Sequence, residues 1–310
     1  MSKVIMYHYI RNFNKNLPYL NFLHIRDFKK QINYFKKEKE GLAKIQDNLD
    51  EILKKKKFIL TFDDGLKDHL KIAKYLKKKN ILGLFFITGQ QFLNSDFLSI
   101  HKLHLIFGKF PIKKIYNIIL KNKIKINYNK KSLGVFKLQK NFLDKKNPHS
   151  EKNLKIFLKT TLNNLQGSNR KIIDKIFDNL FLKKDQKKIF KNFYLNKKDI
   201  KYLDKIGMII GSHGFDHNVL SKKNYSNQKE DIISSCKILS NILGKEIKYF
   251  CYPYGGSNVF NKNTIKILKK IKIKYCFNVN SKNWTQKSNK LSIPRYDCNE
   301  FKFGKIYKYN

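Results

Sequence analysis

Two adjacent carboxylates, Asp63 and Asp64, come directly after a short apolar stretch that begins at Phe58. The stretch is typical of a buried strand, and α/β folds keep their ligands at the C-terminal ends of such strands. Because successive side chains of a strand point to opposite faces, the two acids do different work unless the turn at Gly65 reorients one of them. The alternative is a strand followed by an Asp-Gly turn whose acids cap a helix.

Two histidines, His213 and His217, follow a second apolar stretch at 207–211. Two imidazoles four residues apart converge on one cation if the turn between them is helical. A carboxylate from another strand end then completes a set of two histidines and one acid with open positions for water and substrate. The remaining acid lies close by as a base for the water. The alternative for this segment alone is a polar loop with two surface histidines.

Strands and helices alternate on both sides of the middle of the chain. The stretches typical of buried strands lie at 4–7, 58–61, 83–88, 207–211, 249–252 and 275–279. Amphipathic segments that we expect to be helices separate them. This alternation is typical of parallel βαβ units with the helices outside the sheet.

Residues 98–195 break this pattern, because strand signals become sparse there. Lysine-rich segments with helical periodicity lie at 113–121, 151–165, 170–182 and 186–193. We therefore expect one domain, 1–310, interrupted by a mostly helical insertion at about 98–195 that forms a lid or a docking surface. Its histidines, His101, His104 and His149, are expected to be packing or surface residues.

The chain carries 67 Lys and Arg residues against 23 Asp and Glu, a formal net charge of +44. Arginine is rare, which indicates an AT-rich coding sequence as much as a selected basic face. Such a charge attracts anionic partners such as a membrane surface, acidic glycans or nucleotide-linked sugars. We do not expect a nucleic-acid partner, because its binding would need arginines and aromatic side chains gathered on one face.

Cysteine usage and the N-terminal residues bear on the compartment. The four cysteines have no C-x-x-C spacing and lie in apolar contexts, so we expect reduced core thiols. The first residues lack the continuous apolar region of a signal peptide. No window approaches the roughly 18 apolar residues of a membrane span. We expect a cytoplasmic protein, either free or resting on the inner membrane surface.

Three motifs resemble, in this order, those of the polysaccharide deacetylases, which are also called NodB-homology domains or family-4 carbohydrate esterases. They are T-F-D-D-G at 61–65, S-H-x-x-x-H at 212–217 and F-C-Y-P-Y-G at 250–255. The opening M-Y-H-Y at 6–9 and the closing I-P-R at 293–295 resemble the bacterial glycan-biosynthesis branch of this family. The resemblance covers about 3–97 and 196–298, and leaves the expected insertion outside.

The resemblance implies a distorted (β/α) barrel and a metal-dependent hydrolase that removes acetyl groups from N-acetylated, less often O-acetylated, sugars. The substrate would be a saccharide of surface polysaccharide or glycolipid biosynthesis, linked to a nucleotide or a lipid. Asp63 would be the general base, and Asp64, His213 and His217 would bind one divalent ion. Zinc is the first expectation, with cobalt, nickel or manganese as alternatives. Tyr254 would donate its backbone N–H to the oxyanion.

Three departures from the family pattern concern the arginine that orients the base, a hydroxyl after the first histidine, and the general acid. Cys251 stands where the family has an arginine that orients the base, and we expect Arg295 to replace it from another strand end. A guanidinium binds a carboxylate in bidentate geometry, which lysine cannot do. Gly214 also removes a hydroxyl that many members have after the first histidine.

The C-terminal histidine that is the general acid of the family is missing, since no histidine follows His217. In the similar poly-N-acetylglucosamine deacetylases the motifs are permuted and an N-terminal histidine takes this role. We therefore expect His8, at the end of the first strand, to protonate the leaving amine, with His24 as a weaker candidate. Trp284 is expected either as an apolar wall for the acetyl group or as a core residue.

Two other functions stay open at this point. Related folds with similar ligands hydrolyse non-peptide C–N bonds in small ring amides, which predicts a small closed pocket. A catalytically inactive basic barrel that binds glycan or nucleic acid is the other alternative. Retention of all four expected base and metal residues counts against an inactive barrel.

Overall fold

The protein is described from a computed structural model, which covers residues 1–93, 95–124, 155, 158, 162 and 168–307. The chain forms two compact units. The first comprises 1–12, 22–96 and 190–307, and the second contains 13–21 and 97–189 apart from the undescribed positions. The expectation of one domain over 1–310 with an insertion at 98–195 stays a prediction.

The first unit contains a curled sheet of seven strands in the order β8-β7-β6-β5-β4-β1-β9. All neighbouring strands run parallel. The strands are β1 Lys3–Tyr7, β4 Phe58–Phe62, β5 Gly83–Ile87, β6 Ile209–Ser212, β7 Tyr249–Cys251, β8 Tyr275–Phe277 and β9 Tyr296–Asp297. A separate pair of short strands consists of β2 Ile10–Arg11 and β3 Leu23–His24.

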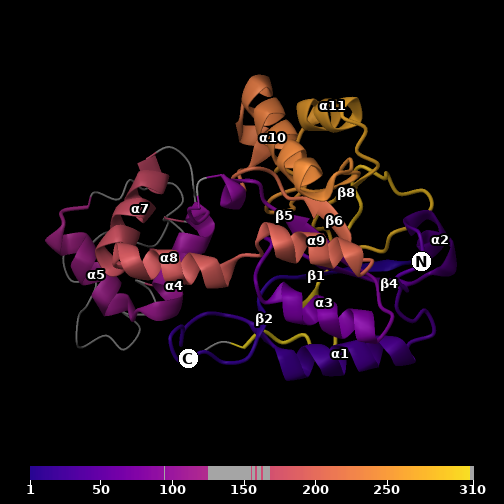
Figure 1. Cartoon of the computed structure of the whole chain (residues 1–310), viewed down its shortest axis with the longest axis horizontal. Coiled ribbons are helices and arrows are strands. Elements are labelled where there is room, and N and C mark those ends of the chain that lie inside the picture. Colours follow the sequence, from indigo (N-terminus) through magenta and orange to yellow (C-terminus); the bar gives the residue numbers. More distant parts are fainter. Residues whose placement is uncertain (94, 125–154, 156–157, 159–161, 163–167, 308–310) are drawn as a thin grey trace, which may run out of the picture. The chain divides into compact units, whose positions relative to one another are not determined.

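Helices lie around the outside of these strands (Figure 1). They are α1 Ile25–Lys37, α2 Leu49–Lys55, α3 His69–Lys78, α9 Lys197–Lys205, α10 Tyr225–Leu243 and α11 Lys262–Lys270. Side chains alternate along each strand. On β4, Phe58, Leu60 and Phe62 pack with the helices, whereas Ile59 belongs to a second core inside the curl of the sheet. Residues that directly follow the strands and lie on the same face as Ile59 therefore meet inside the curl of the sheet.

The segment 293–297 links the two edges of the sheet. Ile293 forms a parallel bridge with Phe277 of β8, and β9 pairs with β1. The sheet therefore curls on itself, which confirms the predicted distorted barrel. Arg295 lies on this linking segment, between Ile293 and β9.

Both ends of helix α10 are capped. It begins at Tyr225 because the Asn224 side chain accepts the N–H of Asn227. It ends at Gly244, whose φ of 68° favours glycine. Among the described residues, no helix is both long enough and apolar enough to cross a membrane. The four cysteines are free and buried, as expected for reduced core thiols.

The described residues of the second unit between 97 and 189 are mainly helical. Its helices are α4 Ser99–Lys109, α5 Ile112–Lys121, α7 Ser168–Leu180 and α8 Lys183–Phe193, the last of which ends in the first unit. The helices expected at 113–121, 170–182 and 186–193 are thus confirmed within three residues at each end. Helix α4 was missed, and it carries the buried His101. The helix expected at 151–165 falls largely outside the described residues, as does His149.

Candidate active site

The end of β4 delivers two carboxylates in two different directions. The backbone N–H of Asp63 still donates to the carbonyl of Tyr7, at 3.0 Å, so Asp63 continues the inner face that includes Ile59. Asp64 then adopts a left-handed backbone with a φ of 76°, and Gly65 follows with a φ of 65°. Few residues other than glycine adopt this conformation, although aspartate tolerates it better than most. The turn therefore reorients Asp64, and the two adjacent acids face different partners.

Asp63 forms a bidentate ion pair with Arg295. Both guanidinium nitrogens Nη1 and Nη2 donate to the carboxylate at 2.8 Å, and the two side chains are buried. The other donations of Arg295 go to the Asn278 carbonyl, Thr61 Oγ1 and Cys251 Sγ, each at 3.0 Å. Burial alone would raise the pKa of Asp63, but the charge and hydrogen bonds of Arg295, together with the charges of His213 and His8, outweigh burial and lower that pKa to about 2. Asp63 is therefore ionised and held in one orientation.

Asp64, His213 and His217 form a buried group that fits a divalent cation. Both imidazole Nε2 atoms lie 3.6 Å from Asp64 Oδ1, and the three ligand atoms lie within 4.8 Å of one another. His213 Nδ1 lies 2.9 Å from the Cys251 carbonyl. Because a carbonyl only accepts, Nδ1 carries the hydrogen and Nε2 keeps a lone pair for a cation. Burial lowers the pKa of His213, which favours the neutral, ligating form.

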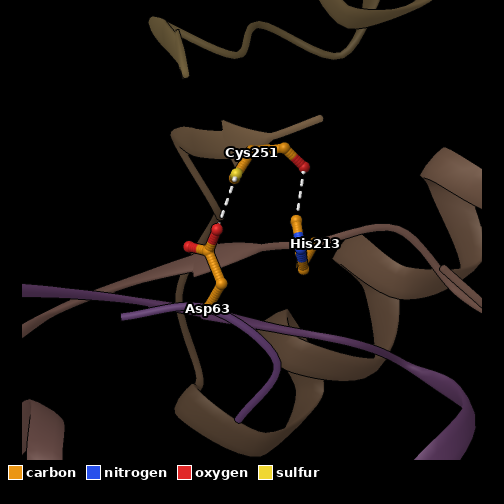
Figure 2. A group of neighbouring side chains, drawn as sticks. All are labelled: Asp63, His213 and Cys251. Carbon is orange, nitrogen blue, oxygen red and sulfur yellow. Dashed lines mark hydrogen bonds between the residues drawn. The ribbon is translucent and has the colours of Figure 1, made fainter. Parts of the chain in front are cut away.

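A second group of possible ligands consists of Asp63, His213 and Cys251. Figure 2 shows Cys251 between the other two, with its thiol toward Asp63 and its carbonyl toward His213. Arg295 already donates to both Asp63 and the Cys251 sulfur, so a metal ion here would face its positive charge. Burial also raises the pKa of the Cys251 thiol well above its ordinary value, and metals bind the thiolate. This group therefore connects Asp63 to His213 and does not fit a second metal.

His8 directly follows the end of β1. It follows Tyr7, whose carbonyl pairs with the Asp63 N–H, so the alternation of β1 turns His8 toward the inner face with Asp63. The charge of His8 contributes to the lowered pKa of Asp63. His24, the weaker candidate for the acid, instead caps helix α1, where its Nδ1 accepts the N–H of Arg26 at 3.1 Å.

The two residues expected at the substrate lie in different places. The Tyr254 ring packs edge-on against His217, with 4.7 Å between ring centroids, so this residue adjoins the ligand group. Trp284 is fully buried, and its backbone pairs with Ser2 before the start of β1. Tyr7 lies five positions after Ser2, which is about 16 Å along a strand. Trp284 is therefore a core residue at the opposite end of the sheet, and the structure does not bring it to the acetyl site.

One residue that sequence reasoning missed holds the histidine loop. Asp231 on α10 accepts the N–H of Phe215 at 2.7 Å and an ammonium bond from Lys223 at 2.7 Å. A Cβ at Gly214 would lie 3.0 Å from Asp231 Oδ1, and the φ of Gly214 is 74°. The glycine thus lets Asp231 approach the loop that begins at His213. A carboxylate on the buried face of an otherwise apolar helix was the available signal.

Sequence and fold comparisons agree with this site. Residues 175–289 match the family model described as polysaccharide deacetylase. Poly-beta-1,6-N-acetyl-D-glucosamine N-deacetylase of Staphylococcus aureus is 30% identical over 123 residues, which cover 37% of this chain and 41% of that protein. The chain thus matches less than half of the length of this relative.

Solved structures extend the likeness to nearly the whole chain. Streptococcus pyogenes deacetylase PplD in complex with acetate aligns with a TM-score of 0.55 at 15% identity, over 96% of this chain and 91% of that one. IcaB from Ammonifex degensii aligns with a TM-score of 0.54 at 16% identity, over 94% and 89%. The predicted resemblance to the polysaccharide deacetylases is confirmed, in sequence around the histidine loop and in fold over the chain.

Proposed function

We propose that the protein is a metal-dependent hydrolase that removes acetyl groups from an N-acetylated sugar in bacterial surface-glycan biosynthesis. One observation carries the proposal: an arginine-held carboxylate, Asp63, directly precedes an acid that meets two histidines inside the curl of the sheet. The match to the polysaccharide deacetylase family model and the likeness to the poly-beta-1,6-N-acetyl-D-glucosamine N-deacetylase support the same activity.

Asp64, His213 and His217 would hold the cation, for which we propose zinc first, with cobalt, nickel or manganese as alternatives. A divalent ion bound there lowers the pKa of water and polarises a carbonyl oxygen. The three ligands leave positions for water and substrate, as hydrolytic sites of this composition require.

Asp63 would take the proton of the attacking water, and Arg295 fixes its direction through two parallel hydrogen bonds. The backbone N–H of Tyr254 would donate to the oxyanion that forms on the acetyl group. His8 would give its proton to the departing sugar amine, so that the C–N bond breaks with a neutral leaving group. Acetate and the free amine are the products.

The substrate class follows from the sequence relatives and the charge. The relatives are named for poly-beta-1,6-N-acetyl-D-glucosamine, so we propose an N-acetylglucosamine-containing glycan or its nucleotide- or lipid-linked precursor. A net charge of +44 favours a phosphate-bearing carrier and an anionic membrane surface. We propose that the protein acts in the cytoplasm or at the inner face of the membrane.

The test is acetate release by the full chain from N-acetylglucosamine oligosaccharides. The protein is stripped with a chelator, and zinc, cobalt, nickel and manganese are added back one at a time. We expect acetate only after metal is restored, and none from the Asp64→Asn variant under any metal. Absence of acetate from every N- or O-acetylated saccharide, with metal bound, contradicts the proposal. Hydrolysis of small ring amides instead would point to the other hydrolase class.

A further inference from the structure

The first turn of α3 holds the segment after β1 at two points. His69 Nε2 lies 2.8 Å from the backbone carbonyl of His8. Asp68, the residue before α3, accepts the N–H of Arg11 Nε at its Oδ2, at 2.7 Å. The two contacts lie on either side of Tyr9. The segment that carries His8 is therefore anchored to the helix that follows the two catalytic carboxylates.

The His69 side chain is placed and protonated to donate a hydrogen bond to the His8 carbonyl. The side chain is fully buried, with its ring 5.6 Å from the Phe62 ring and 5.9 Å from the Phe85 ring. Because the His8 carbonyl only accepts, Nε2 carries the hydrogen. Burial lowers the pKa of His69, so the ring is neutral and Nδ1 keeps a lone pair.

The Nδ1 lone pair of His69 lowers the stability of the fold. Nδ1 is buried, and among the described residues it has no hydrogen-bond partner. A buried polar atom without a partner destabilises the fold, whereas a phenylalanine would fill the same space between Phe62 and Phe85 without that loss. What histidine has and phenylalanine lacks is the Nε2–H that donates to the His8 carbonyl. A residue that lowers stability but makes such a contact is expected where the position of the contacted residue matters for function.

The His8 backbone needs such an anchor because the sheet pairing ends before it. The ladder between β1 and β4 has its last register pair at Tyr7 and Phe62, and the Asp63 N–H then takes the Tyr7 carbonyl. The next backbone bond of the segment joins the Leu23 N–H to the Tyr9 carbonyl, at 2.9 Å. Between these two bonds, the His8 carbonyl is held by His69.

We propose that His69 is a positioning residue for His8: its N–H fixes the His8 carbonyl, and with it the direction in which the His8 imidazole delivers its proton to the leaving amine. The Asp68–Arg11 pair supports the same segment from the other side. This inference rests on the proposed function, in which His8 is the acid. His69 itself does not touch the substrate.

The variant His69→Phe tests the proposal, because it keeps an aromatic ring and removes the donor. We expect kcat to fall by roughly 10- to 100-fold, the cost of misplacing a reacting group by about 1 Å, with KM and metal content unchanged. The matched variant His69→Gln keeps an N–H of similar reach and should recover most of the lost turnover.

A double-mutant cycle separates positioning from a structural role. In the His8→Ala background, which itself should lose roughly 10²–10⁴-fold in turnover, His69→Phe should have no further effect. The same loss in both backgrounds overturns the inference, because His69 would then act without His8. If His8→Ala turns over normally, the acid assignment of the proposed function fails instead.

The leaving group provides a second readout that a general weakening of the fold would not mimic. An aryl acetate ester expels a phenolate that needs no proton, so its hydrolysis should be almost unaffected by His69→Phe, while the N-acetyl sugar reaction falls. An equal loss with both substrates contradicts the inference. If His69→Phe does not fold, Asp68→Asn breaks the second anchor and is judged by the same two criteria.

Discussion

The two sides of the candidate site start from neighbouring residues but are built by opposite means. On the base side, Asp63 stays in the strand alternation and is held by five hydrogen bonds that Arg295 donates to it and to its surroundings. On the ligand side, Asp64 and His217 both have left-handed backbones, with φ of 76° and 56°. Backbone strain of this kind persists only where the surroundings impose it.

The difference shows what each side must achieve. A carboxylate that meets an internal guanidinium needs only a straight strand and a well-placed arginine. Three ligand atoms that converge within 4.8 Å from two loops need turns that an ordinary strand end does not provide. Asp231 and Gly214 supply the support for the second task, on the histidine loop. We therefore expect the two sides to fail differently when they are perturbed.

The largest contrast should come from removing one charge on each side. Asp63→Asn and Asp64→Asn should each lower acetate release by roughly 10²–10⁴-fold or more, because the first removes the base and the second a metal ligand. Metal content separates them: we expect Asp63→Asn to retain the ion and Asp64→Asn to lose it. Elemental mass spectrometry of the dialysed proteins measures this.

A surface carboxylate of α9 provides the control for both variants. Asp204→Asn should leave acetate release and metal content at the level of the parent protein, since the Asp204 side chain forms a surface ion pair with Lys245. Equal loss of metal from Asp63→Asn and Asp64→Asn would contradict the division of the site into a base side and a ligand side.

The next effect concerns the base side alone. Arg295→Met leaves the Asp63 charge buried without its partner, which typically costs about 3–5 kcal/mol of unfolding free energy. Arg295→Lys keeps the charge but not the paired donors. We therefore expect this variant to lose less unfolding free energy than Arg295→Met, and still to show a marked loss of turnover. Arg26→Met, at a largely exposed arginine, should change stability by less than about 0.5 kcal/mol.

The contribution of Asp63 to the pH dependence of the unfolding free energy should have opposite signs in the parent protein and in Arg295→Met. In the parent protein the pKa of Asp63 is lowered from 3.8 to about 2, so its contribution is present above pH 3.8 and is lost as pH falls toward 2. In Arg295→Met the dominant remaining influence is burial, which raises the pKa of Asp63 above 3.8. Protonation then favours the native state, and the stability gap between the two proteins should narrow on acidification. Urea unfolding at several pH values between 7 and 3 measures this gap, and a gap that widens on acidification would count against the buried pair.

The sequence predicted the fold and most of the contacts at the site for identifiable reasons. Apolar stretches that end in polar residues placed the acids and histidines at strand ends, where parallel strands bring them together. Arg295 was expected at Asp63 because arginine is rare in this chain and the usual arginine position is Cys251. The structure brings these two side chains into contact at 2.8 Å.

The parts that were missed depend on information that local patterns do not carry. Helix α4 is buried on most sides, so it lacks the one-sided apolar pattern that marks a surface helix. Local patterns left Trp284 open between an acetyl-site wall and a core residue, and its pairing with Ser2, far away in the sequence, decides for the core. The roles of Asp231 and His69 rest on contacts to backbone atoms, and residue type alone does not indicate these.

The smallest effect should come from Cys251, which touches both sides of the site. Its sulfur accepts from Arg295 at 3.0 Å, and its carbonyl receives the His213 N–H at 2.9 Å. Only the first contact belongs to the side chain. Because burial keeps the thiol protonated, it contributes no charge to the base or to the ligands.

Cys251→Ser keeps a small group that accepts from Arg295, so we expect turnover to change by less than about threefold and unfolding free energy by about 1 kcal/mol, the net worth of one hydrogen bond. The ligand side should keep its metal, since the backbone carbonyl that orients His213 is unchanged. Acetate release, urea unfolding and metal content are measured beside the parent protein. Loss of metal from Cys251→Ser would mean that the thiol belongs to the ligand set, and that the two sides of the site share more than a backbone carbonyl.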